Sequence, residues 1–363
     1  MVKERHDGLP FDAVPWFLAG MENGHSAERP RRVTIYDIAA ATGFAASTVS
    51  RALSRPERVS ATTRERIASA ARELSYVPNS PTPDLKRTKT VAILVSDVTN
   101  PFYFGLIRGI QHQLKAVGYA SLLIDSENSS EIESAMLHRV RQSVDGAIFA
   151  ASRLTGVRLA ELGAELPLVV INRRVHGVPS VVIDSPSGVV QAAEHLISLG
   201  HREIVYVSGP QNSWANEARW RSLAQACATH RVPVRRLGPF PAGPKSGSAA
   251  ADALIRTRAT ACIAFNDLLA IGMLTHLRTR GIAVPAAISI VGCDDIFGAD
   301  FCHPALTTLS APIEQAGRAA VTMLMAHLTH DVPATRSTTV LPAHLVVRES
   351  TGPAPRRRPA AGR

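Results

Sequence analysis

A short segment near the start of the chain carries the side chains best suited to contact nucleic acid. Residues 33–53 read VTIYDIAAATGFAASTVSRAL. Thr48 and Ser50 have small hydroxyl groups that suit phosphate oxygens, and Arg51 can make a bidentate contact to guanine. Tyr36 is a further candidate for a phosphate contact. Side chains of these types are chemically suited to contact DNA.

The chain lacks the motifs of the common enzyme classes. It has no GxSxG, HExxH, P-loop or GxGxxG motif. His327 and His330 stand three residues apart, but no third metal ligand is near in sequence, so we interpret them as solvated or packed side chains. Asp294 and Asp295 are adjacent, and neighbours on a strand point to opposite faces, so they are poorly placed to act on one substrate. We therefore expect no enzyme activity, no metal and no cofactor.

The positive charge of the chain is concentrated in two places. Lys and Arg total 40 against 30 Asp and Glu, which gives a net charge of +10. Residues 31–90 carry a net charge of +6 and residues 353–363 carry +4, whereas residues 91–352 carry only +2. A localised basic segment on a nearly neutral body is typical of a nucleic-acid module joined to a domain with another task.

Several features argue against a secreted or membrane protein. No uncharged run exceeds thirteen residues, which is short of the roughly 20 apolar residues that span a bilayer. We find no pattern of a signal peptide. The four cysteines are dispersed without a CxxC pair, which favours free thiols in a reducing compartment. We therefore expect a cytoplasmic protein that makes no membrane contact.

Short helices must position the DNA-reading side chains. Thr34 and Asp37 have the spacing of a capping box, with Asp in place of the usual Glu, and predict a helix over residues 35–41. Gly43 interrupts this helix, and a second short helix is expected over residues 46–53.

A third helix completes the pattern. Thr62 and Glu65 have the spacing of another capping box. Ile67, Ala71 and Leu74 then form one apolar face. Three short helices with a glycine-containing turn between the first two predict a helix-turn-helix.

The composition along the chain suggests five segments. Residues 1–31 lack periodicity and are expected to be disordered, and residues 32–77 form the DNA-binding headpiece. Residues 78–90 form a proline-rich hinge or linker. Residues 91–350 are expected to form one large domain and residues 351–363 a disordered basic tail.

Beyond the linker, apolar β-branched runs alternate with helical patterns. Strands are expected over residues 91–95, 121–124, 147–150, 168–171, 204–207, 262–265 and 288–291. Helices are expected over residues 106–117, 189–199, 218–230, 268–280 and 313–328. Continuous apolar strands separated by helices indicate parallel sheets covered on both faces. The block is large for one sheet, so we expect two lobes with a ligand cleft between them.

The order of the motifs resembles the lactose-repressor/galactose-repressor (LacI/GalR-type) family of transcription regulators. VTIYDIA, the turn glycine, STVSRAL, VSxxTRERI and LSYVPN follow in family order, and NPFY, LGHREIVYVSG, FND, VGCDD and PALTTL continue the match. The resemblance covers nearly all of residues 32–350. It implies a small all-α helix-turn-helix headpiece followed by a two-lobed α/β effector domain similar to periplasmic binding proteins.

The resemblance also implies which residues contact DNA. Ala46 and Ser47 occupy positions where family members read bases, and because both are short we expect Arg51 to carry more of the direct readout. Leu85 stands where family members insert a leucine from a hinge helix into the minor groove. The predicted set is Thr34, Tyr36, Ala46, Ser47, Thr48, Ser50, Arg51, Asn79 and Leu85.

Two prolines leave the structure of the hinge open. If Ser80 is the N-cap, Pro81 and Pro83 fall in the first turn, where proline is tolerated. If the helix starts at Asn79, Pro83 is interior and disturbs it. An ordinary flexible linker is the alternative.

For the large domain, the resemblance implies a cleft that binds a small effector. Arg219 matches the family's ligand-contacting arginine, although Ser222 replaces the usual Gly, and Asn172 stands where relatives often carry Asp. Polar groups framed by aromatic rings suit a sugar or sugar derivative. Each Asn or Asp at a strand end has the alternative role of capping the next helix. The predicted set is Asn100, Phe102, Tyr103, Arg173, Arg219, Phe240, Asn266 and Asp294.

These features together predict a dimeric, ligand-responsive repressor of a carbohydrate-utilisation operon that binds a palindromic double-stranded DNA operator. The resemblance implies the dimer and makes residues 91–350 the effector-binding and dimerisation domain. Half-site geometry agrees, because one recognition helix reads few base pairs and two-fold symmetry doubles the contact. The alternative is a solute-binding or carbohydrate-acting protein that does not act through DNA. The basic helical segment near the start of the chain favours the regulator.

Overall fold

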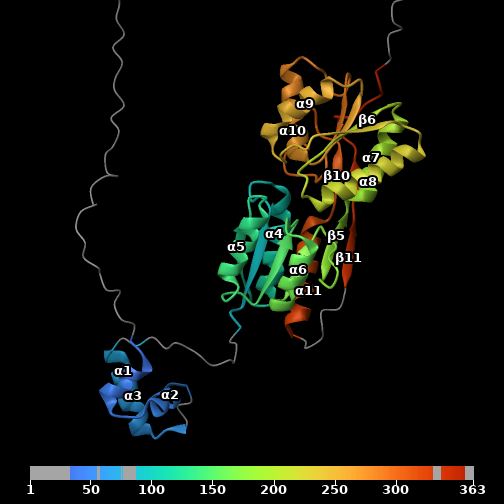
Figure 1. Cartoon of the computed structure of the whole chain (residues 1–363). Coiled ribbons are helices and arrows are strands. Elements are labelled where there is room, and N and C mark those ends of the chain that lie inside the picture. The colour runs from blue at the N-terminus through green and yellow to red at the C-terminus, as the bar shows by residue number, and fades with distance from the viewer. Residues whose placement is uncertain (1–32, 55–57, 75, 77–86, 330–336, 356–363) are drawn as a thin grey trace, which may run out of the picture. The chain divides into compact units, whose positions relative to one another are not determined.

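The computed structural model describes residues 33–54, 58–74, 76, 87–329 and 337–355. The chain divides into two compact units, Met1–Leu85 and Lys86–Arg363. Figure 1 shows the elements of each unit, and each unit is described by itself.

The described part of the first unit consists of three helices, α1 (Ile35–Thr42), α2 (Ala46–Ser54) and α3 (Ala61–Glu73). The N–H and the hydroxyl of Thr34 each donate to the Asp37 carboxylate at a distance of 2.7 Å. The predicted capping box at the start of α1 is therefore confirmed. Gly43 ends α1 with a φ of 74°, a left-handed conformation that favours glycine.

A small apolar core holds the three helices together. Ile38 of α1, Val49 and Ala52 of α2 and Ile67 of α3 are buried in it, and Leu74 packs against it. The apolar face predicted for the third helix is thus the face that packs into this core.

The start of α3 corrects one prediction. Ser60 is the N-cap, and its hydroxyl accepts a hydrogen bond from the Thr63 N–H at 3.3 Å. Because the helix begins at Ala61, Thr62 already lies inside the first turn. The predicted capping box between Thr62 and Glu65 is therefore wrong. A serine satisfies the same unpaired N–H groups two residues earlier.

The second unit contains two lobes, each built on a parallel sheet. The first lobe has a six-stranded sheet with the order β11 (Thr338–Pro342), β5 (Ser180–Asp184), β4 (Leu168–Ile171), β3 (Gly146–Ala150), β1 (Thr90–Val95), β2 (Ala120–Asp125). All of its pairings are parallel. Helices cover both faces, with α4 (Phe102–Ala116) and α11 (Ile313–Thr329) on one and α5 (Ser130–Val140) and α6 (Gly156–Glu165) on the other.

The second lobe has a four-stranded parallel sheet with the order β7 (Val234–Leu237), β6 (Ile204–Val207), β8 (Ala261–Ala264), β9 (Ser289–Val291). One face packs against α7 (Ser185–Ser198) and α8 (Trp214–Thr229). The other face packs against α9 (Gly247–Ile255) and α10 (Asp267–Thr279). A short 3₁₀ turn, η2 (Pro244–Ser246), precedes α9.

The chain passes between the lobes three times. It does so from β5 into α7, from β10 (Thr308–Ser310) into α11, and from β11 into β12 (His344–Val346). β10 and β12 pair with each other as an antiparallel ribbon, and both contact α7. The two lobes are thus joined by several short strand and helix ends.

The parallel sheets covered by helices confirm the predicted fold class. Every strand and helix predicted for this unit is present within a few residues of its expected bounds. Strands β5, β7, β10, β11 and β12 and helices α5, α6 and α9 were not predicted. None of the helices that the structure describes is long and apolar enough to cross a membrane.

Candidate functional site

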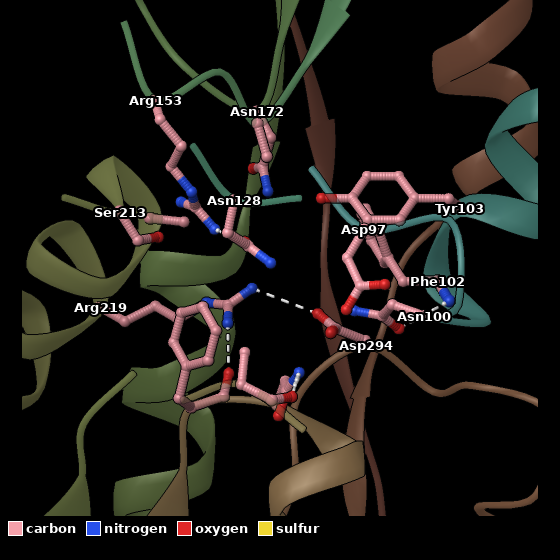
Figure 2. Close-up of a pocket in the computed structure, with 15 residues that line it drawn as sticks. Asp97, Asn100, Phe102, Tyr103, Asn128, Arg153, Asn172, Ser213, Arg219 and Asp294 are labelled. Atoms are coloured by element: carbon pink, nitrogen blue, oxygen red, sulfur yellow. Dashed lines mark hydrogen bonds and ion pairs between the residues drawn. The ribbon is translucent and has the colours of Figure 1, made fainter. Parts of the chain in front are cut away.

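A pocket lies where the carboxyl ends of the strands of both lobes meet. Residues of both lobes line it, and small-molecule sites occur preferentially at such boundaries between domains. Six of the eight predicted effector residues line it: Asn100, Phe102, Tyr103, Arg219, Asn266 and Asp294. Figure 2 labels five of these side chains around the cavity, those of Asn100, Phe102, Tyr103, Arg219 and Asp294. The strand-end rule for ligand sites in open α/β sheets explains why residues distant in sequence meet here.

Arg219, which extends from α8, is the centre of the polar network on the second lobe. It is 4% exposed. Its guanidinium donates to the Phe265 carbonyl at 2.6 Å, to the Ser185 hydroxyl at 3.0 Å and to the Asp294 carboxylate at 3.4 Å. Its carbon Cζ also lies 5.5 Å from the centre of the Phe265 ring. The side chain is therefore held in place before any ligand binds.

Asp294 is the negative partner in this network. Burial raises its pKa to about 7, because the desolvation of the carboxylate outweighs the attraction of Arg219. The carboxylate therefore titrates near neutral pH, where it can accept a ligand hydroxyl when charged.

Asp294 and Asp295 follow strand β9 and have separate partners. Both have positive φ angles, 124° and 51°, so the chain turns sharply here instead of continuing as a strand. Asp294 pairs with Arg219, whereas Asp295 accepts from Arg348 at 2.7 Å. The two carboxylates are directed to different neighbours, although the reason is the turn and not the strand alternation that the sequence suggested.

Two asparagines in the pocket also shape the backbone around it. The Asn266 side chain caps α10 by accepting from the Leu269 N–H at 3.0 Å, and it donates to the Ala242 carbonyl at 2.8 Å. The Asn100 side chain accepts from the Phe102 N–H at 3.0 Å. The capping role considered for strand-end amides is thus present at Asn266, while its side chain still lines the pocket.

Aromatic rings form the apolar part of the pocket. Phe102 and Tyr103 contact each other edge to face, with ring centres 5.2 Å apart. Phe265 lies on the second lobe, and a Cβ at Gly209 would come within 2.3 Å of its ring, so only glycine fits there. Rings on both lobes can stack on the apolar face of a sugar or a base.

Two predicted residues do not line the pocket. Arg173 donates to the carbonyls of Ser152 and Leu154 and so supports the loop after β3. Phe240 packs against the core of the second lobe. The structure therefore brings together six of the predicted side chains and leaves these two outside.

The pocket also contains polar residues that the sequence analysis did not select. Asp97, Asn128 and Arg153 follow β1, β2 and β3, and Asn172 follows β4. Each of them obeys the strand-end rule, which was the signal that could have identified them. Ser213, the N-cap of α8, completes the polar lining.

The predicted DNA-contacting residues of the first unit lie on α1 and α2. Tyr36 is 71% exposed, and Ser47, Ser50 and Arg51 are exposed on α2. Thr34 is the N-cap of α1, and Ala46 and Thr48 lie in the first turn of α2. Val49 and Ala52 point to the core, so the polar face of α2 is turned outward. Asn79 and Leu85, together with Pro81 and Pro83, lie outside the described residues.

Metal binding finds no support in the described parts of the chain, where no group of three or more His, Cys, Asp or Glu side chains could hold an ion.

Two family models match the chain. One, described as bacterial regulatory proteins of the lacI family, matches residues 34–79, and another, described as a periplasmic binding protein-like domain, matches residues 193–351. The first covers the three-helix unit. The second covers the second lobe and the C-terminal strands that return to the first lobe.

Transcriptional regulators match over almost the full chain. The regulator DegA of Bacillus subtilis is 33% identical over 338 residues, which cover 89% of this chain and 99% of DegA. The repressor CytR of Escherichia coli is 29% identical over 330 residues, which cover 88% of this chain and 96% of CytR. The regulator CelR of Thermobifida fusca is 32% identical over 341 residues, which cover 89% of this chain and 99% of CelR.

Solved structures give the same result. A CelR–cellobiose complex is 31% identical with a TM-score of 0.64, and it covers 88% of this chain and 100% of its own. A lac repressor dimer bound to operator and an anti-inducer is 25% identical with a TM-score of 0.65, and it covers 89% of this chain and 100% of its own. With a helix-turn-helix unit, a two-lobed α/β unit and relatives that match both, the chain belongs to the LacI family of bacterial transcriptional regulators.

Proposed function

We propose that this regulator is a homodimeric repressor that binds a palindromic operator and responds to a small polyhydroxylated effector. The observation that carries the proposal is the pocket between the two lobes, in which Arg219, Asp294 and Asn266 face Asn100 and Tyr103. Such a site can respond to a ligand only by binding one arrangement of the lobes better than another.

The chemistry of the pocket supports a sugar-like ligand. Amide and carboxylate groups can donate to and accept from several hydroxyl groups at once, and the rings of Tyr103 and Phe265 can cover an apolar face. Among the related structures, one is a complex with cellobiose and another holds bound ribose. We infer a ligand of the same general class here, and no chemical transformation of it.

The first unit supports DNA reading through α2. Its outward face presents hydroxyl groups and Arg51, which can reach base edges in the major groove, while Tyr36 can contact the backbone. One short helix reads few base pairs, so a two-fold dimer on a palindrome is the expected arrangement. The lac repressor relative is a dimer bound to operator.

The switch we propose uses the three passages between the lobes. A ligand in the pocket contacts both lobes, so it favours one relative angle of the two over others. That angle would set the spacing of the two hinge segments in a dimer and therefore the fit of the headpieces to the operator. Leu85 in the hinge would act as the minor-groove wedge.

Footprinting of the full chain on its own promoter region tests the proposal. We expect a protected palindrome whose protection changes when one small metabolite is added. Absence of a specific palindrome would overturn it.

The salt dependence of DNA binding separates this proposal from a solute-binding protein that does not act through DNA. A repressor that neutralises several phosphates loses affinity steeply as salt rises. A solute-binding protein that does not act through DNA should show almost no dependence of DNA affinity on salt concentration.

A further inference from the structure

Arg153 carries a positive charge into the pocket that no carboxylate of the described chain neutralises at close range. It follows β3 on the first lobe and is mostly buried. Its guanidinium donates to the Asn128 side-chain carbonyl at 2.7 Å, but its Nε is buried with no hydrogen-bond partner among the described residues. A buried charge without a counter-charge is costly, because water no longer solvates it.

Two carboxylates on the first lobe, Glu133 and Asp97, accept hydrogen bonds from groups other than the Arg153 guanidinium. Glu133 accepts from the backbone N–H of Arg153 at 2.9 Å and so fixes the loop instead of the guanidinium. Burial raises the pKa of Glu133. Asp97 accepts from the N–H and the hydroxyl of Thr99 at 2.9 and 2.6 Å. Burial also lowers the pKa of Arg153, because the desolvation of the guanidinium outweighs the attraction of Glu133.

The contrast with the second lobe is informative. Arg219 is at least as buried, but Asp294 lies 3.4 Å from it. The pocket therefore has one guanidinium that is paired and one that is not. Figure 2 shows both guanidinium groups extending into the cavity from opposite lobes.

Asn172 explains why the charge of Arg153 is uncompensated. It follows β4, the direct neighbour of β3 in the sheet, so both residues stand at the same edge. An aspartate at this position would supply a carboxylate beside Arg153. Asn172 instead offers a neutral amide, whose buried Oδ1 has no partner in the described chain. This end of the pocket thus has an unused donor and an unused acceptor but no negative charge.

We propose that the effector carries an anionic group, a carboxylate or a phosphate, that binds Arg153 and Asn128, with an adjacent hydroxyl that donates to Asn172. The remainder of the ligand would be the hydroxylated part that Arg219, Asp294 and Asn100 contact. The inference rests on the proposed function, because it assumes that this pocket is the effector site. It narrows the effector from sugars in general to acidic sugar derivatives.

Titration calorimetry and thermal shift of the full chain test this class with four probes: glucose, glucuronate, glucose phosphate and inorganic phosphate. We expect the anions to raise the melting temperature and to bind more tightly than glucose, by about 10- to 100-fold for the preferred sugar anion, as a charged hydrogen bond provides. The affinity should fall as salt concentration rises. The ranking of glucuronate and glucose phosphate identifies the carboxylate or the phosphate as the anionic group.

Three variants connect the result to the pocket. Arg153→Gln should abolish the preference for the anions over glucose. Asn172→Asp should abolish it as well while leaving Arg153 in place. With two variants, the inference can still be tested if one of them folds poorly. Arg158→Gln removes an exposed arginine of α6, paired with Glu161, and should change nothing.

Two results would overturn the inference. One is that none of the three anions stabilises the protein or binds more tightly than glucose. The other is that Arg153→Gln weakens neutral and anionic probes equally. If the anions bind through Arg153 but leave operator affinity unchanged, the inference stands and the proposed switch fails.

Discussion

The ion pair between Arg219 and Asp294 gives the sharpest prediction for the pocket. In Arg219→Met, Asp294 loses its buried partner, and the carbonyl of Phe265 and the hydroxyl of Ser185 lose a donor. Methionine keeps much of the side-chain volume, so the loss is mainly electrostatic. Breaking one side of a buried pair costs about 3–5 kcal/mol, a large part of the roughly 5–15 kcal/mol that holds a typical domain together.

Urea unfolding followed by tryptophan fluorescence measures this cost, because Trp214 and Trp220 lie on the same helix as Arg219. At pH 8 we expect a loss of about 3–5 kcal/mol in the free energy of unfolding. The loss should shrink toward pH 5, because Asp294 can then be protonated and no longer leaves a bare charge.

A neighbouring arginine provides the control. Arg221 lies two residues along α8 and forms an exposed pair with Glu217, so Arg221→Met should change stability by less than about 0.5 kcal/mol. In a double-mutant cycle with Asp294→Asn, the coupling energy should exceed about 1 kcal/mol. A loss of stability at position 219 as small as at position 221, or full additivity in the cycle, would refute the reasoning.

Three more predictions concern the pH profile, the cap of α3 and the DNA surface. The pKa of Asp294 is about 7 in the folded protein and near 3.8 without burial. Between these values the folded state holds a proton that the unfolded state has lost, so the stability of the protein falls as pH rises from 4 to 7. In Asp294→Asn, the free energy of unfolding measured with urea should depend less on pH over this range, and an unchanged pH dependence would contradict the assignment. Ser60→Ala should destabilise α3 by about 1 kcal/mol, which faster hydrogen exchange of the α3 amides in the full chain would show. Thr62→Ala should have little effect on this exchange. Equal effects of the two substitutions would contradict the assignment of Ser60 as the N-cap. Arg51→Ala should cost about 1–3 kcal/mol of operator affinity by anisotropy titration and relax the preference for one base pair, and a uniform loss across operator sequences would assign Arg51 to phosphate instead.

The sequence predicted the elements whose patterns are regular. The apolar stripe of α3 identified its packing face in the first unit, and the apolar runs identified the central strands, because such strands are buried on both faces. The strands that were missed lie mainly at sheet edges. β7 reads VRRL and β11 begins with two threonines, and polar residues are typical of exposed edges.

The pocket was predictable where a motif or a strand end marks the residue. Arg219, Asn266 and Asp294 were selected through motifs, and the strand-end rule would also have found Arg153. Arg173 shows the limit of that rule. Asn172 has a φ of 63°, which turns the chain and directs Arg173 to backbone carbonyls of a neighbouring loop. Asparagine is enriched in this conformation, but the residue type alone does not fix where the next side chain is directed.

The most direct test of the whole account is the operator affinity of the full chain, measured with and without a ligand that binds the pocket. Binding coupled to the lobe angle must change operator affinity, and by reciprocity operator must change ligand affinity by the same factor. We predict a change of at least about fivefold, the lower end of typical coupling between sites, and no response in a folded Arg219→Met protein. A ligand that binds tightly through Arg219 yet leaves operator affinity unchanged would contradict the account.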